Sequence, residues 1–135
     1  MFKRLKYFSL ADLSQQMVGG FLLTGPFVVT EEVWNLAQNL RYYHSLLLII
    51  IVFCIGYGAL YGANKDRDPD KETKIAGIPV RFISLMAVTY LSVVILIFLF
   101  NAIETFHADF YTAGKVVTIA SIFSVIGAAT ADSLL

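Results

Sequence analysis

The sequence predicts an all-α, polytopic membrane protein built as a bundle of four transmembrane helices. The 135-residue chain is 58% hydrophobic and only 15% charged, whereas soluble domains usually hold about a quarter charged residues. The charged residues are also segregated, since none lies between Ser45 and Ala63 or between Phe82 and Ala102. Runs of this length match the roughly 20 residues that an α-helix needs to cross a bilayer.

We expect spans at 14–37, 45–63, 79–103 and 114–134, within one integral membrane domain that covers 1–135. Each must be helical, because in lipid every backbone N–H and C=O has to be bonded within its own segment. The first span needs polar residues at its ends, since its apolar stretch runs only from Met17 to Thr30. A soluble helical bundle is the alternative class, and the lack of a polar face on the second and third spans disfavours it.

The distribution of lysine and arginine predicts the orientation. One basic residue, Arg41, lies in the loop after the first span, and one, Lys115, lies at the start of the fourth span. The other eight lie at the amino end, in the loop at 64–78 or directly after it, at Arg81. By the positive-inside rule, both termini and the loop at 64–78 are expected to be cytoplasmic, in the plasma membrane. Gly25-Pro26 interrupts the first apolar run, which favours a retained span over a cleaved signal peptide.

The first span carries the most informative pattern, two adjacent carboxylates at Glu31 and Glu32. Residues three, four and seven apart share one face of a helix. The polar residues of the first span follow this spacing, so they lie in one sector of the helix surface. Pro26 should kink the helix just before the carboxylates. We interpret the sector as the lining of a water-filled ion path in which the acidic side chains attract cations. The candidate path residues are Thr24, Pro26, Thr30, Glu31, Glu32, Trp34 and Asn35.

A structural interpretation of the same residues stays open. The helix could simply reach the membrane surface at Glu31, with Glu32 and Trp34 among the lipid headgroups, where an acidic side chain costs little. The string Thr30-Glu31-Glu32-Val33-Trp34 is also similar to the Thr-x-Glu-x-Trp element in the selectivity filters of tetrameric sodium and calcium channels, as an analogy in residue type alone.

Other patterns concern helix packing and secondary ion sites. Small residues four apart let helices approach closely in membranes, and they recur at Gly58, Gly62, Ala120, Ser124 and Ala128. Asp132 follows on the last of these faces, where it could pair with Arg81 or Lys74, or mark the inner mouth of a path. Asn101 and Glu104 close the third span and could join an outer carboxylate cluster.

Several classes of site are disfavoured. The chain has one cysteine, Cys54, which excludes an internal disulfide and a cysteine-rich metal site. The two histidines lack a ligand spacing, and the run Asp66, Asp68, Asp70 lacks the glycine and the glutamate of a calcium loop. We expect no metal, no cofactor and no nucleic-acid partner. We also expect that the protein is not an enzyme, because its sequence has no nucleophile motif.

A family resemblance runs along most of the chain. The strings that carry it are Gly19 to Leu23 with Gly25-Pro26-Phe27, Thr30 to Trp34, Ile55 to Tyr61, Ala76 to Phe82, and Ile126 to Ser133. These resemble a family of small archaeal and bacterial integral membrane proteins, domain of unknown function 2391. The resemblance implies the membrane class and no assigned activity.

Two functions follow as hypotheses. The first is a small oligomeric cation channel or transporter, in contact with the lipid bilayer and a monovalent or divalent cation, whose subunits form a homo-oligomer because so short a chain has little room for a private cavity. The second is a non-transporting membrane scaffold or accessory subunit. Measured cation flux would separate them.

Overall fold

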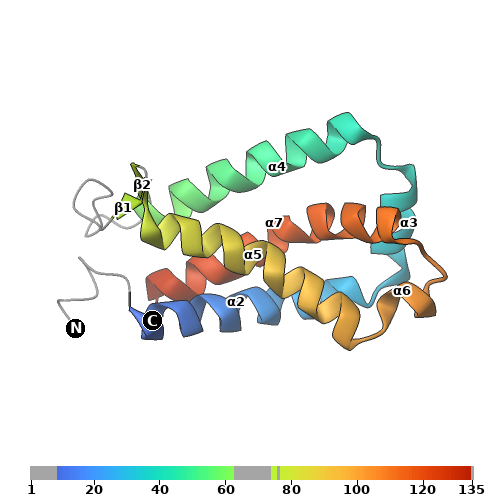
Figure 1. Ribbon diagram of the computed structural model, residues 1–135, viewed down its shortest axis with the longest axis horizontal. Coiled ribbons are helices and arrows are strands. Elements are labelled where there is room, and N and C mark those ends of the chain that lie inside the picture. The colour runs from blue at the N-terminus through green and yellow to red at the C-terminus, as the bar shows by residue number, and fades with distance from the viewer. Residues whose placement is uncertain (1–8, 63–73, 76, 135) are drawn as a thin grey trace.

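The computed structural model describes residues 9–62, 74–75 and 77–134, and these form an all-α bundle with one very short strand pair (Figure 1). The long helices are α2 (Leu10–Val28), α4 (Tyr42–Tyr57), α5 (Val80–Leu99) and α7 (Phe110–Leu134). The short helices α3 (Glu31–Asn39) and α6 (Ala102–Thr105) lie at one end, which we call the α3/α6 end. The start of α2, the strand pair and the end of α7 lie at the opposite, β1/β2 end.

Three helical segments among the described residues are long and apolar enough to cross a membrane, namely Tyr42–Gly62, Val80–Leu99 and Phe110–Asp132. They correspond to the second, third and fourth predicted spans. The third ends at Leu99 and not at 103, because Asn101 adopts a left-handed backbone with φ 53°. The fourth begins earlier than expected, at Phe110, where Asp109 supplies a cap through a hydrogen bond from Thr112 N–H to its carboxylate at 2.7 Å.

The first predicted span, 14–37, is corrected by the structure, which has two helices there. α2 ends at Val28, two residues after Pro26, and Thr30 then takes an extended conformation with φ −92° and ψ 140°. Thr30 is the N-cap of α3, and its hydroxyl accepts a hydrogen bond from Val33 N–H at 3.4 Å. A side-chain cap of this kind begins a new helix, so the chain changes direction at Val29–Thr30.

α2 has a polar side that faces the bundle and an apolar side that faces outward. Asp12, Gln16 and Thr24 are buried, whereas its exposed large side chains are all apolar: Leu10, Met17, Val18, Leu22 and Leu23. α2 packs most extensively against α7 and next against α5. Asp12 and Gln16 lower the mean hydropathy of α2, and neighbouring helices cover both side chains.

α4 leans on α7 and makes less contact with α5, and Figure 1 shows it splayed from the other helices toward the α3/α6 end. Only Val52 and Gly56 are buried within it. Apolar side chains cover the rest of its circumference, as on a helix surrounded by lipid. It continues into η1 (Gly58–Gly62), a π-helical turn. Gly58 and Gly62 are exposed, and a Cβ at either would meet nothing within 4 Å, so the close packing predicted for them is not found within the chain.

The strands β1 (Lys74–Ile75) and β2 (Ile78–Pro79) pair antiparallel, with Ile75 opposite Ile78. Gly77 turns the chain between them with φ +82°, a conformation that favours glycine. Most of the predicted loop at 64–78, including the aspartates at 66, 68 and 70, lies outside the described residues, as does the basic amino end. Arg81 is no loop residue, because it is buried in the first turn of α5.

The core consists of two apolar clusters. One lies toward the α3/α6 end and includes Val28, Trp34, Ile97, Val116 and Ala120. The other lies toward the β1/β2 end, and its members are Val52, Leu60, Tyr61, Leu85, Met86, Val88, Val125, Ala128 and Ala129. Alongside them, buried polar side chains line the interface of α2, α5 and α7.

Candidate functional site

An ion network lies between α2, α5 and α7 at the β1/β2 end. Arg81 Nη1 donates to Asp132 Oδ1 at 2.7 Å, and Arg81 Nη2 lies 3.3 Å from Asp12 Oδ2. The side chains of these residues are at most 3% exposed. Ionised groups inside a membrane protein are costly and are usually retained for a function. Of the two partners that the sequence offered for Asp132, Arg81 and Lys74, the structure shows a contact with Arg81.

Two neutral side chains extend this network along the same interface. Gln16 Nε2 donates to Asp132 Oδ2 at 3.2 Å, and Ser84 Oγ donates to Gln16 Oε1 at 2.8 Å. Gln16 lies one helical turn from Asp12, and Ser84 lies three residues after Arg81. Each helix therefore contributes to the ion network, and together the five residues, Asp12, Gln16, Arg81, Ser84 and Asp132, form what we call the inner network.

Local sequence places the inner network. Ser9 begins α2 as its N-cap, and Ser9 N–H donates to Asp12 Oδ2 at 3.0 Å while the Ser9 hydroxyl accepts from Asp12 N–H. This reciprocal capping box fixes the first turn of α2 and the direction of the Asp12 carboxylate. Pro79 precedes the first turn of α5, so that Arg81 enters the bundle at the same level.

Hydroxyl groups continue the polar interface beyond the inner network. A Cβ at Gly20 would lie 2.8 Å from Ser92 Oγ and 3.3 Å from Ser124 Oγ, so these residues of three helices meet closely. Ser124 Oγ donates to the Thr89 carbonyl at 2.9 Å. Thr24, one turn beyond Gly20, is fully buried, and its hydroxyl has no hydrogen-bond partner among the described residues. A buried hydroxyl without a partner is a place where water or an ion can bind.

A second polar site lies at the α3/α6 end. A pocket of about 280 Å³ is lined by Glu31, Trp34, Asn35, Gln38, Thr105, Phe106 and His107. It brings three of the predicted path residues, Glu31, Trp34 and Asn35, together with the α6 segment. Glu31 and Glu32 are both exposed, and only Glu31 lines the pocket. We call this the outer pocket.

Three of the predicted path residues, Pro26, Thr30 and Trp34, lie where α2 ends and α3 begins. Thr30 caps α3, and Pro26 lies in the last turn of α2. Trp34 is 1% exposed, and its Nε1–H donates to the Val28 carbonyl at 2.9 Å while its ring stacks on Phe106 at 5.3 Å. Trp34 thus satisfies a carbonyl that the end of α2 leaves free and holds α3 against α6.

The secondary candidates are divided between two ends of the bundle. Asn101 and Glu104 lie at the α3/α6 end, where Asn101 Nδ2 donates to Glu104 Oε2 at 3.1 Å, and both are exposed. They do not line the outer pocket. Asp132 lies in the inner network at the other end. On α7, the predicted packing face is confirmed, since Ala120, Ser124 and Ala128 are each fully buried. Within the described residues, no group of three or more acidic, histidine or cysteine side chains could hold a metal ion.

Sequence reasoning missed Asp12. The available signal was Ser9-Leu10-Ala11-Asp12, a capping-box spacing at the start of an apolar run. That signal locates a helix start but not the partner of Asp12, which is Arg81, 69 residues away in the chain.

The comparisons with known proteins return one family. The family model titled "Putative integral membrane protein (DUF2391)" matches residues 3–135. Neither the curated proteins nor the solved structures include a match to the chain.

Proposed function

Because the chain belongs to the DUF2391 family of integral membrane proteins, and because charged groups are buried between its helices, we propose that it is a small cation transporter. The observation that supports this most directly is the inner network, in which Arg81 contacts the carboxylates of Asp12 and Asp132. Carboxylates in such a position can exchange an arginine partner for a proton or a cation, which is the usual use of acidic groups within membrane helices.

In this proposal α2 is a fourth span. Its 19 residues rise by about 28 Å, close to the ~30 Å hydrocarbon thickness of a bilayer. Its polar residues face α5 and α7, and its outward side is apolar. An even number of spans puts both chain ends on one side of the membrane, as the positive-inside rule also predicts for a plasma-membrane protein with cytoplasmic termini.

The proposed path runs along the α2–α5–α7 interface. Glu31 in the outer pocket attracts the cation, hydroxyls such as those of Thr24 and Ser124 line the middle, and the inner network receives it. Buried apolar residues, among them Val28 and Ile97, occupy the α3/α6 end of the core. A packed cluster of this kind favours a transporter that changes conformation over a permanently open channel.

The oligomeric state belongs to the same proposal. α4 exposes apolar side chains on several sides, including Leu46, Ile50 and Phe53. Such a surface suits lipid or a second copy of the chain, and symmetric association is common among small membrane proteins. A homo-oligomer would repeat the outer pocket around an axis and raise the local concentration of cations.

A test uses the adjacent carboxylates as a matched pair. Purified wild type, Glu31→Gln and Glu32→Gln are reconstituted in liposomes, and fluxes of K⁺, Na⁺ and H⁺ are measured with internal dyes. We expect flux above that of empty liposomes for the wild type and a greater loss for Glu31→Gln than for Glu32→Gln, because only Glu31 lines the outer pocket. Equal losses would remove the outer pocket from the path.

A non-transporting membrane scaffold is the second candidate. The structural roles of Thr30 and Trp34 favour it, because they explain part of the Thr30–Trp34 string without any ion. The scaffold predicts background flux for the wild type together with an intact fold.

A further inference from the structure

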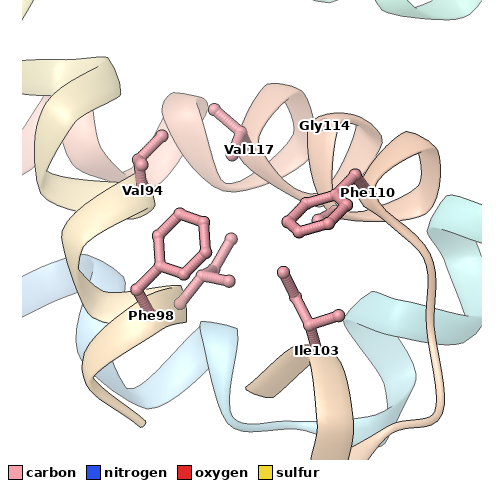
Figure 2. A pocket seen from close by; sticks show the side chains of 8 residues that line it. Val94, Phe98, Ile103, Phe110, Gly114 and Val117 are labelled. Atoms are coloured by element: carbon pink, nitrogen blue, oxygen red, sulfur yellow. The ribbon is translucent and has the colours of Figure 1, made fainter. Parts of the chain in front are cut away.

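A crevice between α5, α6 and α7 has the shape and polarity of a lipid-binding site. Its lining is apolar and includes Val94, Phe98, Ile103, Phe110, Gly114 and Val117, around a volume of about 170 Å³. Figure 2 shows Phe98 and Phe110 on opposite sides of the crevice, with Ile103 projecting toward it from α6. The two phenyl rings lie 6.5 Å apart between centroids and are 60% and 74% exposed.

The crevice is continuous with a polar site at the end of the bundle. A second pocket, of about 180 Å³, shares Ile97, Phe98, Ile103 and Phe110 with the first and adds Asn101 and Glu104. Asn101 Nδ2 donates to Glu104 Oε2, so the amide helps to orient the carboxylate. The combined site therefore has one apolar end and one end that carries a negative charge.

The direction of this polarity matches that of a lipid in a bilayer. Val94 and Val117 lie further along α5 and α7, toward the middle of two helices that are long and apolar enough to cross a membrane. Asn101 and Glu104 lie where those helices end. A lipid in the crevice would point its acyl chain toward the bilayer centre and place its headgroup at Glu104.

We propose that this crevice binds one membrane lipid whose headgroup carries a primary ammonium group. The acyl chain packs between Phe98, Phe110 and Gly114, and the ammonium group donates hydrogen bonds to the Glu104 carboxylate. An ammonium offers three N–H donors to a carboxylate, whereas a choline headgroup has none. A headgroup with only a phosphate would be repelled by the charge of Glu104.

The site suggests a variant that fills it. Gly114 lines the crevice, is exposed, and has nothing within 4 Å of where a Cβ would lie, so a side chain can start there, and Gly114→Leu would take up the acyl-chain space. Gly58→Leu is the matched control, because Gly58 has equally open surroundings and lies in η1, outside the crevice. Glu104→Gln removes the charge that selects the headgroup, and Glu32→Gln removes an exposed carboxylate that lines neither part.

In the experiment, the full chain is reconstituted in nanodiscs that contain equal parts of dioleoyl phosphatidylethanolamine, phosphatidylcholine and phosphatidylglycerol. The protein is then released from the nanodiscs, and its bound lipids are identified by native mass spectrometry. We expect the wild type, Gly58→Leu and Glu32→Gln to retain one phosphatidylethanolamine in preference to the other lipids. Gly114→Leu should lose this lipid, and Glu104→Gln should keep a lipid with its preference lowered about threefold, the effect of an exposed ion pair.

Three results would overturn the proposal: a wild type that retains the three lipids in the proportions of the nanodisc, retention by Gly114→Leu equal to that of the wild type, or an unchanged headgroup preference in Glu104→Gln. A second copy of the chain over the crevice would appear as a dimer that carries no lipid, which also contradicts it. These results do not depend on cation flux, so the lipid site and the transport proposal can fail separately.

Discussion

Arg81 joins three helices through its guanidinium group. Its guanidinium contacts Asp132 on α7 and Asp12 on α2, and it is 1% exposed. A buried ion pair adds little net stability compared with apolar residues of the same size, but removal of one partner leaves the other charge buried without compensation. The inner network is therefore expected to be more sensitive to the loss of Arg81 alone than to the loss of Arg81 together with one carboxylate charge.

For Arg81→Gln we expect a loss of unfolding free energy of about 3–5 kcal/mol, because the buried carboxylates of Asp12 and Asp132 both lose the guanidinium. Adding Asp132→Asn to that variant should recover part of the loss, because it removes one of the two carboxylate charges. The measurement is denaturant unfolding in detergent micelles, followed by the fluorescence of Trp34, the single tryptophan. Glu32→Gln, at an exposed position, should stay within about 0.5 kcal/mol of the wild type. A paired variant less stable than Arg81→Gln would show that the charges do not compensate each other.

Asp109 is a second residue with a defined electrostatic role, at the start of α7. The Thr112 backbone N–H donates to its carboxylate at 2.7 Å, and this hydrogen bond lowers the pKa of Asp109 below its usual value. The charged form is therefore favoured in the folded state. Its contribution to stability is present above the unfolded pKa, near pH 4, and is lost as the pH falls through the lower, folded pKa.

We expect the wild type to be more stable than Asp109→Asn at pH 7 and the difference to shrink as the pH is lowered below about 4. Unfolding of both proteins across this range would test it, together with a carbon-13 NMR titration of the Asp109 carboxyl group. A difference that stays constant down to pH 2 would mean that the cap does not depend on charge.

At the scale of elements, α2 and α7 approach each other closely at a pair of glycines. A Cβ at Gly19 would clash with the backbone oxygen of Gly127, and a Cβ at Gly127 would clash with the backbone oxygen of Gly19. The two backbones therefore meet without side chains between them, as small residues allow in membrane helices. This contact brings Asp12 and Asp132 to the same level of the bundle.

Gly127→Ala should destabilise the protein by about 1–3 kcal/mol, because the methyl group pushes α2 away from α7. Gly114→Ala, in the same helix with open space around it, should instead be neutral or stabilising by up to about 1 kcal/mol, the difference in helix propensity. Thermal unfolding of the two variants side by side provides the comparison. Equal effects would indicate that propensity, and not the helix contact, decides the result.

At the scale of the whole molecule, the arrangement of α2 decides how the chain crosses the membrane. Figure 1 shows α2 running beside α5 and α7 from one end of the bundle to the other. If α2 crosses, Leu10 and Ile78 lie on one side of the membrane and Asn39 lies on the other.

Single cysteines at these three exposed positions test the topology in a Cys54→Ser background, with a membrane-impermeant maleimide added to intact cells and to inverted vesicles. We expect Asn39→Cys to react from outside, and Leu10→Cys and Ile78→Cys only after inversion. Labelling of Leu10→Cys and Asn39→Cys from the same side would show that α2 does not span.

The sequence alone was sufficient for the membrane class and for three of the helices, because an uncharged run as long as Phe82 to Ala102 is typical of a helix that crosses a bilayer. It also offered Arg81 as a partner of Asp132, with Lys74 as the other candidate, since these residues lie at the same expected depth. The break at Thr30 was missed, because the string Thr30-Glu31-Glu32 was interpreted for ion binding or for a place at the membrane surface, and not also as an N-cap followed by the acidic first turn of a new helix. The inward direction of Asp12 could not be predicted, since it depends on contacts between distant segments.

The central claim is that the interface containing Arg81 and Asp132 moves cations. The most direct measurement is the flux of K⁺, Na⁺ and H⁺ into liposomes that contain either the wild type or the paired variant Arg81→Gln with Asp132→Asn, each shown to be folded by its unfolding transition. The account predicts flux above that of empty liposomes for the wild type and near-background flux for the paired variant. Wild-type flux equal to that of empty liposomes for all three ions, or full flux in the folded paired variant, would contradict it.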